Sequence, residues 1–340
     1  MEQVANKYSV ISASAGQAPV RRFTAIALSF VAMSAFLAGW LPLRMSIATV
    51  FLFAGPHNWI EFRYFLSRTP VRLGPFRGYF IVAAAGVIAL AALQIGLPLL
   101  ASSLRSTGAG WSGLIAGWNG LLIAWVVALV YMRSRQVPRF DWRAALAVGA
   151  ALLAADVLAP ALWSLGLVYL HPLLALWFLH RQLRRTRPEW MGAYRACLAA
   201  IPFLLVLLWV KLAGGSALAA DNGLALRITL HAGAGLLPGL NSGALVATHA
   251  FLETIHYGIW ILALPLLGLQ NPPWRVGAIP LVRNRLGWPR LVKGLLVLGG
   301  FAVVALWACF LLNYSTTRDV YFSLAIVHVL VEVPFLIRMA

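Results

Sequence analysis

Long apolar runs separated by short polar loops make up almost all of this 340-residue chain. A run of about 20 apolar residues is long enough for a helix to cross a bilayer. The pattern therefore predicts an all-α fold, a polytopic integral membrane helical bundle of about ten transmembrane helices. The predicted spans are 24–43, 45–66, 76–101, 112–132, 142–158, 160–183, 191–212, 243–268, 290–313 and 319–338.

The two ends of this pattern set the domain organisation. Residues 1–22 are polar and end in Arg21 and Arg22, and the apolar run that follows is too long for a signal-peptide core. The sequence therefore predicts a polar N-terminus over 1–22 and a single transmembrane helical domain over 23–340. The apolar, glycine-rich segment 224–240 fits either an interfacial helix or a re-entrant loop.

Basic residues alternate between the two sides of the predicted bundle. The N-terminus, the C-terminus and the loops after spans 2, 4, 6 and 8 hold 22 of the 27 Lys and Arg. This bias is the positive-inside pattern, and it predicts a multi-pass protein of the cell's inner (plasma) membrane with both termini cytoplasmic. The net charge of +18 therefore reflects short loops, and nucleic acid is not an expected partner.

Five of the seven histidines fall in the middle of predicted spans, and three of them precede a glutamate by four residues. Charged residues at bilayer depth cost about 2.5–3.5 kcal/mol on insertion scales, so they are functional candidates. Nine acids among 340 residues would give about 0.2 such pairs by chance. The histidines are His57, His171, His249, His256 and His328, and the glutamates are Glu61, Glu253 and Glu332.

The span 243–268 carries the densest group of these residues. His249, Glu253 and His256 lie on one helical face over three successive turns. The two histidines are separated by about 10 Å along the axis, so both cannot bind one metal ion. We expect one of them, preferentially His256, to be a ligand and the other to support that site or a second one.

Imidazole with carboxylate and no thiolate is a ligand set for iron, zinc, copper or manganese. The two cysteines, Cys197 and Cys309, lie far apart and form no metal-binding motif. The five mid-span histidines are thus predicted metal ligands, and the three glutamates are predicted catalytic groups that orient the imidazoles or ligate directly. A non-haem iron is the favoured cofactor, although another transition metal fits. A metal among apolar helices implies membrane lipids as surroundings and a lipophilic small-molecule substrate.

Three short segments resemble a known family. The segment Gly55–Glu61 (Gly-Pro-His-Asn-Trp-Ile-Glu) resembles the G-x-P-H-G-A-L-D motif of bacterial Brp/Blh-like β-carotene 15,15′-dioxygenases. The segment His328–Arg338 resembles that family's closing P-H-x-x-x-x-D region, and Ile255–Gly258 is similar to its I-H-F-G element. The resemblance covers about 30 residues. It implies a polytopic membrane protein with a histidine-bound non-haem iron that cleaves β-carotene with oxygen to give retinal.

Other functions use the same residues. A proton-coupled transporter would use the His and Glu side chains as a proton relay. A bis-histidine haem protein would use His57 with His249 or His328 as axial ligands. A structural or assembly role is a further alternative, because a membrane-buried His–Glu pair also orders helix packing. The sequence sets no oligomeric state.

Overall fold

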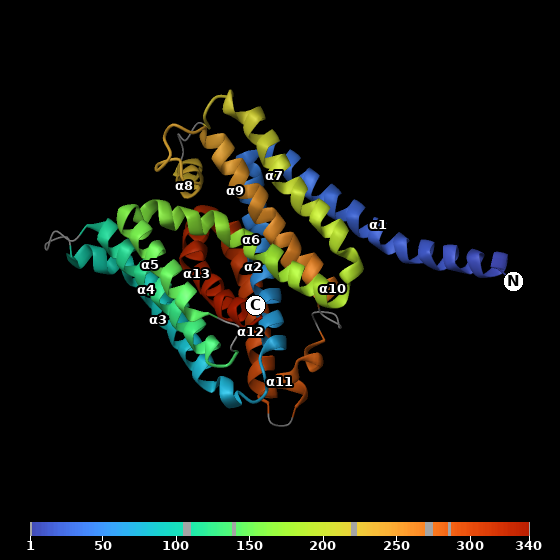
Figure 1. Cartoon of the computed structure of the whole chain (residues 1–340). Coiled ribbons are helices and arrows are strands. Elements are labelled where there is room, and N and C mark those ends of the chain that lie inside the picture. Colours follow the sequence, from blue (N-terminus) through green and yellow to red (C-terminus); the bar gives the residue numbers. More distant parts are fainter. Residues whose placement is uncertain are drawn as a thin grey trace. The chain divides into compact units, whose positions relative to one another are not determined.

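A computed structural model describes residues 2–104, 110–137, 141–218, 223–268, 275–284 and 287–339, and no strand occurs in these ranges (Figure 1). The α-helices are α1 (Glu2–Trp40), α2 (Pro42–Arg68), α3 (Arg77–Leu104), α4 (Trp111–Ser134), α5 (Trp142–Leu158), α6 (Pro160–Thr186), α7 (Met191–Ala213), α8 (Gly223–His231), α9 (Ser242–Gly258), α10 (Leu264–Gly268), α11 (Pro280–Arg283), α12 (Pro289–Leu312) and α13 (Tyr314–Met339). All ten predicted spans fall on helices. The predicted all-α class is therefore confirmed for the described residues.

Eight helical segments among the described residues are long and apolar enough to cross a membrane, which makes this a multi-pass membrane protein. They are Pro19–Trp40, Gly74–Pro98, Trp111–Ser134, Pro160–Thr186, Pro188–Ala213, Ser242–Leu267, Pro289–Leu312 and Tyr314–Met339. The other two predicted spans lie on α5, which has only 17 residues, and on α2, which carries Glu61, Arg63 and Arg68. Those two spans, the membrane compartment and the side on which the termini lie stay predictions.

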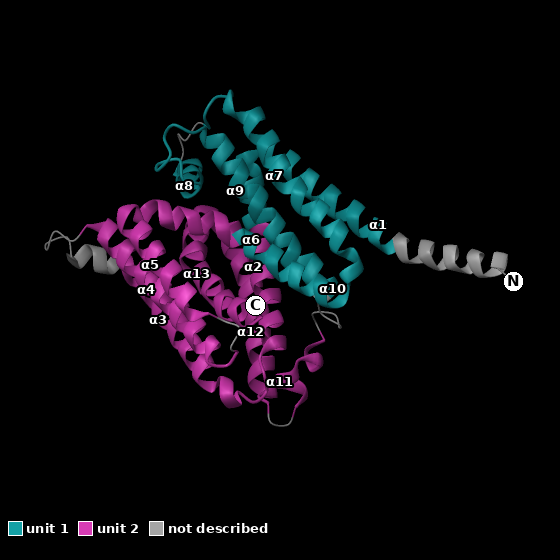
Figure 2. Ribbon diagram, in the orientation of Figure 1, with its two compact units in different colours: residues 1–50, 172–270 teal, residues 51–171, 271–340 magenta. Residues whose placement is uncertain are grey.

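The chain divides into two compact units (Figure 2). Unit 1 comprises residues 1–50 and 172–270, and unit 2 comprises residues 51–171 and 271–340. In unit 1, α9 packs against α1, α7 and α8. Within the span Ser242–Leu267, 67% of the residues are buried, so polar side chains on this helix are held inside protein rather than facing lipid.

Unit 2 is built on α3, α4 and α13, which pack against one another, with α5 on α4 and α12 on α13. Their shared core includes Tyr79, Trp118, Trp125 and Leu330. The indoles of Trp118 and Trp125 donate hydrogen bonds to backbone carbonyls of α3, at 2.9 and 3.0 Å. These bonds satisfy the only polar atoms that the indoles bring into the core.

Two tryptophan side chains form hydrogen bonds between α2 and the backbone of α12, or the reverse, within unit 2. Trp59 Nε1 donates to the carbonyl of Leu296 on α12 at 2.9 Å. In the other direction, Trp307 Nε1 on α12 donates to the carbonyl of Phe51 at 2.9 Å. The pair fixes α2 against α12 at two points, and it thereby sets the position of the polar residues that lie between them on α2.

The close contact between α3 and α4 depends on Gly86. It predicts that alanine at Gly86 and alanine at Gly96 differ in their effect on the stability of the protein. A Cβ at Gly86 would lie 1.9 Å from Nε1 of Trp125, whereas a Cβ at Gly96 would meet nothing within 4 Å. We expect Gly86→Ala to destabilise the protein by about 1–3 kcal/mol, because the indole must move and lose its bond to Val82. Gly96→Ala, the matched control, should be neutral or stabilising by up to about 1 kcal/mol. Thermal unfolding in detergent distinguishes the two, and equal midpoints would contradict the packing described.

Candidate metal centre

Five of the predicted site residues lie in unit 2, on three helices that each carry a proline beside them. Helix α2 contributes His57 and Glu61, α6 contributes His171, and α13 contributes His328 and Glu332. The internal prolines are Pro56, Pro172 and Pro334. Proline has no N–H and clashes with the carbonyl four residues earlier, so it kinks a membrane helix and frees a backbone acceptor. Helices α2, α6 and α13 continue through these positions, so the prolines remove backbone hydrogen bonds next to the site residues without ending the helices.

His57 is oriented by its own helix. Its Nδ1 lies 3.1 Å from the carbonyl oxygen of Phe53, one turn earlier. A carbonyl oxygen only accepts hydrogen bonds, so this contact assigns the proton to Nδ1 and leaves the lone pair on Nε2. The ring is fully buried. His57 is thus held in the tautomer that a metal ligand requires.

His171 and Glu332 form an inter-helix pair. His171 Nδ1 lies 3.2 Å from Glu332 Oε2, and the glutamate side chain is completely buried. A carboxylate next to Nδ1 favours the proton on that nitrogen and the lone pair on Nε2. Carboxylates in this position commonly orient metal-binding imidazoles and raise their basicity. Glu332 therefore contacts a histidine of another helix, although its spacing in sequence pairs it with His328.

His328 lies between the other two imidazoles of unit 2. Its Nε2 is 3.2 Å from Nε2 of His171, and the two ring centres are 5.0 Å apart. The ring of His57 packs edge-on against His328 at 5.2 Å. His57, Glu61 and His328 each offer one ligand atom, and these atoms lie within 4.8 Å of one another. His328 thus contacts His171 on one helix and shares a group of candidate ligand atoms with His57 and Glu61 on another.

The distance between the two Nε2 atoms fits a shared metal ion. Two nitrogens bound to one metal at about 2.0–2.1 Å, with a bond angle of about 90–110°, lie about 2.9–3.4 Å apart. The separation of 3.2 Å between His171 and His328 falls within this range. In the metal-free chain the same distance suits a hydrogen bond from a protonated Nε2 of His328 to His171. A metal ion would replace that proton, as in other sites where binding releases protons.

The buried carboxylates of Glu61 and Glu332 also favour a bound cation. Glu61 is 1% exposed and Glu332 is 0% exposed. Within the described part of the chain, Glu61 has no hydrogen-bond partner or ion pair, and Glu332 has the imidazole of His171 beside it but no Lys or Arg. A buried carboxylate without a donor costs several kcal/mol. A divalent cation among neutral imidazoles would balance both charges, so the residues present fit a bound metal.

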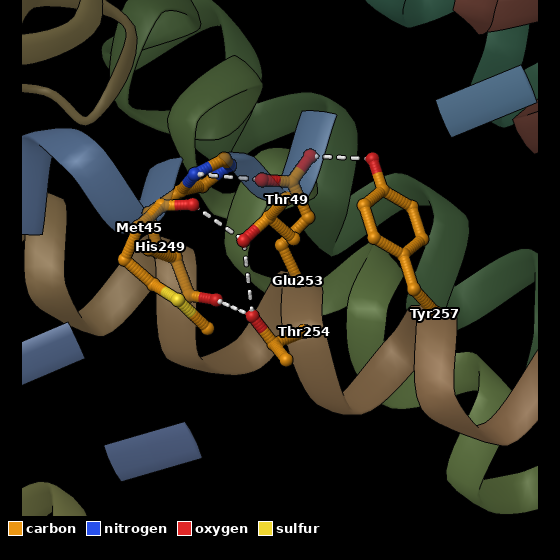
Figure 3. Close-up of polar contacts among 7 residues, drawn as sticks. Met45, Thr49, His249, Glu253, Thr254 and Tyr257 are labelled. Atoms are coloured by element: carbon orange, nitrogen blue, oxygen red, sulfur yellow. Dashed lines mark hydrogen bonds and ion pairs between the residues drawn. The ribbon is translucent and has the colours of Figure 1, made fainter. Parts of the chain in front are cut away.

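His249 and Glu253, from the densest group in the sequence, belong to unit 1 and form a different arrangement (Figure 3). Glu253 Oε1 accepts a hydrogen bond of 2.7 Å from Tyr257, and Oε2 lies 3.7 Å from His249 Nδ1. On the neighbouring segment, the hydroxyl of Thr49 lies 3.4 Å from that of Thr254. The carboxylate is held along one face of α9 by side chains one turn away on either side.

Two further histidines complete the polar interior of unit 1. His256 is 2% exposed, and its Nδ1 lies 3.4 Å from the carbonyl oxygen of Pro172. His231, at the end of α8, packs its ring against His249 with centres 5.0 Å apart. His231 is half-buried, although it lies outside every predicted span. After His256, the helix passes into a π-turn at Ile259–Ala263, a feature that is frequent at functional sites.

The structure thus brings together His57, Glu61, His171, His328 and Glu332 within unit 2. It places His249, Glu253 and His256 within unit 1, where they remain predicted site residues. The pairing of His171 with Glu332 had no signal in the sequence, because 161 positions separate them. The four-residue spacing of Glu253 and Tyr257 could have predicted their contact. The contact of His231 with His249 had no such signal in the sequence.

The structure therefore establishes a multi-pass helical membrane protein with buried His/Glu clusters that can hold a metal ion. Comparison of the chain with protein-family models, with curated proteins and with solved structures finds no match to any of them.

Proposed function

We propose that this protein is an integral-membrane metalloenzyme that oxidises a lipophilic substrate with a His/Glu-bound non-haem iron. One observation carries the proposal: in unit 2 the imidazole of His328 contacts those of His57 and His171, Glu61 lies beside His57 and His328, and Glu332 pairs with His171. His57, His171 and His328 would bind the metal through Nε2, Glu61 would supply a further oxygen ligand, and Glu332 would orient His171. This donor set leaves coordination positions for other ligands, as non-haem iron oxygenases require.

Bound iron would supply the oxygen chemistry, and the remaining requirements fall on the chain itself. His57, Glu61 and Glu332 are at most 1% exposed, which limits the access of bulk water and protects a reactive centre from side reactions. The substrate must then enter from the bilayer. Carotenoids, terpenoids and lipids meet this requirement. The resemblance of the segments around His57 and His328 to carotene dioxygenases favours a carotenoid among them.

A bis-histidine haem is a weaker explanation of the same residues. The His57 and His328 ring centres are 5.2 Å apart, and those of His171 and His328 are 5.0 Å apart. Two imidazoles on opposite sides of a haem iron need about 6 Å, from two bonds of about 2 Å and about 1 Å to each ring centre. The haem alternative also gives the two glutamates no role.

Elemental analysis and an absorption spectrum of the detergent-purified protein test the proposal together. We expect about one equivalent of transition metal, chiefly iron, per protein chain, and we expect no Soret band. A Soret band would contradict the proposal in favour of haem. Protein that stays metal-free after incubation with Fe²⁺ would also contradict it and would favour the proton-relay alternative.

A further inference from the structure

A second buried polar cluster in unit 2 joins α4, α5 and α6. This oxygen cluster consists of the side chains of Asn119, Asp156 and Ser164 and the backbone carbonyl of Pro160. Asn119 Nδ2 donates to Asp156 Oδ1 at 2.7 Å, and it also lies 3.3 Å from Ser164 Oγ and 3.4 Å from the Pro160 oxygen. An amide nitrogen has only two hydrogens, so three oxygens compete for them. Ser164 lies seven residues before His171, or about 10 Å along α6, so the cluster is separate from the candidate metal centre.

Helix α5 directs its one acidic residue into the protein. The buried residues of α5 are Gly149 and Asp156. Asp156 is 1% exposed, whereas its neighbours Val157 and Leu158 are 74% and 85% exposed. The helix thus buries a carboxylate and leaves apolar side chains at its surface, which is the reverse of ordinary packing.

No basic side chain compensates this carboxylate. Within the described part of the chain, Asp156 forms no ion pair with Lys, Arg or His. The nearest basic residues along α4, α5 and α6 are Arg133, Arg143 and Arg181, each about 20–25 Å along its helix from the cluster. A buried carboxylate without a counter-charge is strongly destabilising. A hydrogen bond between α4 and α5 would not need the charge, because a neutral amide at position 156 would accept the same bond.

The end of α5 adds further oxygen atoms beside Asp156. The helix ends at Leu158, and Pro160 begins α6 without an N–H that could donate back to α5. The last carbonyls of a helix lack partners within it and carry a negative partial charge of about 0.5. Helix C-terminal ends with free carbonyls coordinate sodium ions in membrane transporters. The location therefore favours a cation for two independent reasons.

We propose that the oxygen cluster binds one sodium ion. Hard cations take oxygen ligands, which Asp156, Ser164 and the Pro160 carbonyl supply, and the Asn119 amide would turn so that its oxygen faces the ion. A single carboxylate balances one positive charge, so a monovalent ion fits and a divalent ion would leave a charge buried. The strong field of a carboxylate favours sodium over the larger potassium ion. The inference does not depend on the transition metal proposed above.

Two measurements on the detergent-purified full chain test the proposal: equilibrium binding of radioactive sodium, and thermal unfolding in sodium chloride against choline chloride at equal ionic strength. Asp156→Asn is the main variant. Asp141→Asn is the matched control, because it removes the same charge from an exposed position of the same helix and asparagine caps a helix equally well. Arg105→Gln is included because Arg105, outside the described residues, is the only Lys or Arg between positions 78 and 132.

We expect wild type, Asp141→Asn and Arg105→Gln to bind about one sodium ion per chain, with an unfolding midpoint that rises until the site is full. Asp156→Asn should weaken binding by at least about a hundredfold, because it removes the charge in contact with the ion. Ser164→Ala keeps that charge and should weaken binding by about tenfold, which tests the site even if Asp156→Asn does not fold.

Three results would overturn the proposal. The first is the absence of saturable sodium binding by wild type, or equal binding by Asp156→Asn and Asp141→Asn. The second is sodium binding by Arg105→Gln alone, which would identify Arg105 as the counter-charge of Asp156. The third is an unfolding midpoint that responds to lower pH but not to sodium, which would show that Asp156 holds a proton instead.

Discussion

Replacing His328 by alanine is expected to abolish metal binding, because its ring lies between those of His57 and His171. Its Nε2 is 3.2 Å from that of His171, and its ring packs against His57. Loss of a direct ligand should exceed the 10–100-fold effect that is typical of groups supporting a ligand. We therefore expect a drop of more than a hundredfold in metal affinity, measured by metal content after dialysis against a graded chelator.

The matched variants separate ligation from general damage. Glu332→Gln should lower metal affinity by about 10–100-fold, because the amide still lies beside His171 Nδ1 but lacks the negative charge. His180→Ala should leave the metal content unchanged, since its ring packs on Tyr194 in unit 1. Metal content that is insensitive to His328→Ala, or equally sensitive to His180→Ala, would contradict the assignment.

Glu61→Gln is expected to change stability in opposite directions with and without metal. The carboxylate is buried with no hydrogen-bond donor in the described part of the chain. In chelator-treated protein, the neutral amide of the same shape should raise the free energy of unfolding by about 1–4 kcal/mol. In metal-loaded protein the variant should unfold at a lower midpoint than wild type, because weaker binding contributes less stabilisation.

Thermal unfolding with and without chelator checks this reversal of sign. Glu189→Gln is a suitable control, since Glu189 is exposed and pairs only loosely with Arg187 at 3.9 Å. It should be neutral under both conditions. If Glu61→Gln destabilised the chelated protein, the carboxylate would have a structural hydrogen-bonding role, and the charge argument for a cation would fail.

Much of the fold was predictable, because membrane helices are encoded by local composition. The predicted spans match helices to within a few residues, and the boundary between the predicted spans 142–158 and 160–183 coincides with the junction of α5 and α6. The sequence did not predict the π-turn after Gly258. This turn occurs where a Cβ on Gly258 would lie 2.4 Å from the ring of Phe30. Such a close approach depends on residues 228 positions apart, which no local pattern reports.

The candidate site was predictable in its residue types but not in its partners. The four-residue spacing correctly indicates that His328 and Glu332 share a helical face. It does not specify which neighbour that face meets, and Glu332 contacts His171 on α6. His171 is a predicted ligand with no glutamate four residues later, so the sequence names no partner for it. Its contact with Glu332 is seen only in the folded chain.

His231 had no predicted role, yet it forms a contact with another histidine in the folded chain. It lies in the apolar, glycine-rich segment 224–240, outside any predicted span, so the sequence assigned it no site role. The nine-residue helix α8 packs on α9 and brings its ring to His249. Short helices of this kind depend on tertiary packing rather than on their own propensity, and a sequence pattern therefore underestimates them.

X-ray absorption spectroscopy at the K-edge of the bound metal tests the central claim most directly. The three imidazoles and Glu61 predict a shell of nitrogen and oxygen atoms only, at about 2.0–2.2 Å. The multiple scattering should correspond to three imidazoles in wild type and to fewer in any residual metal of His57→Ala. A sulfur shell at about 2.3 Å, or a shell without imidazole scattering, would contradict the proposed centre.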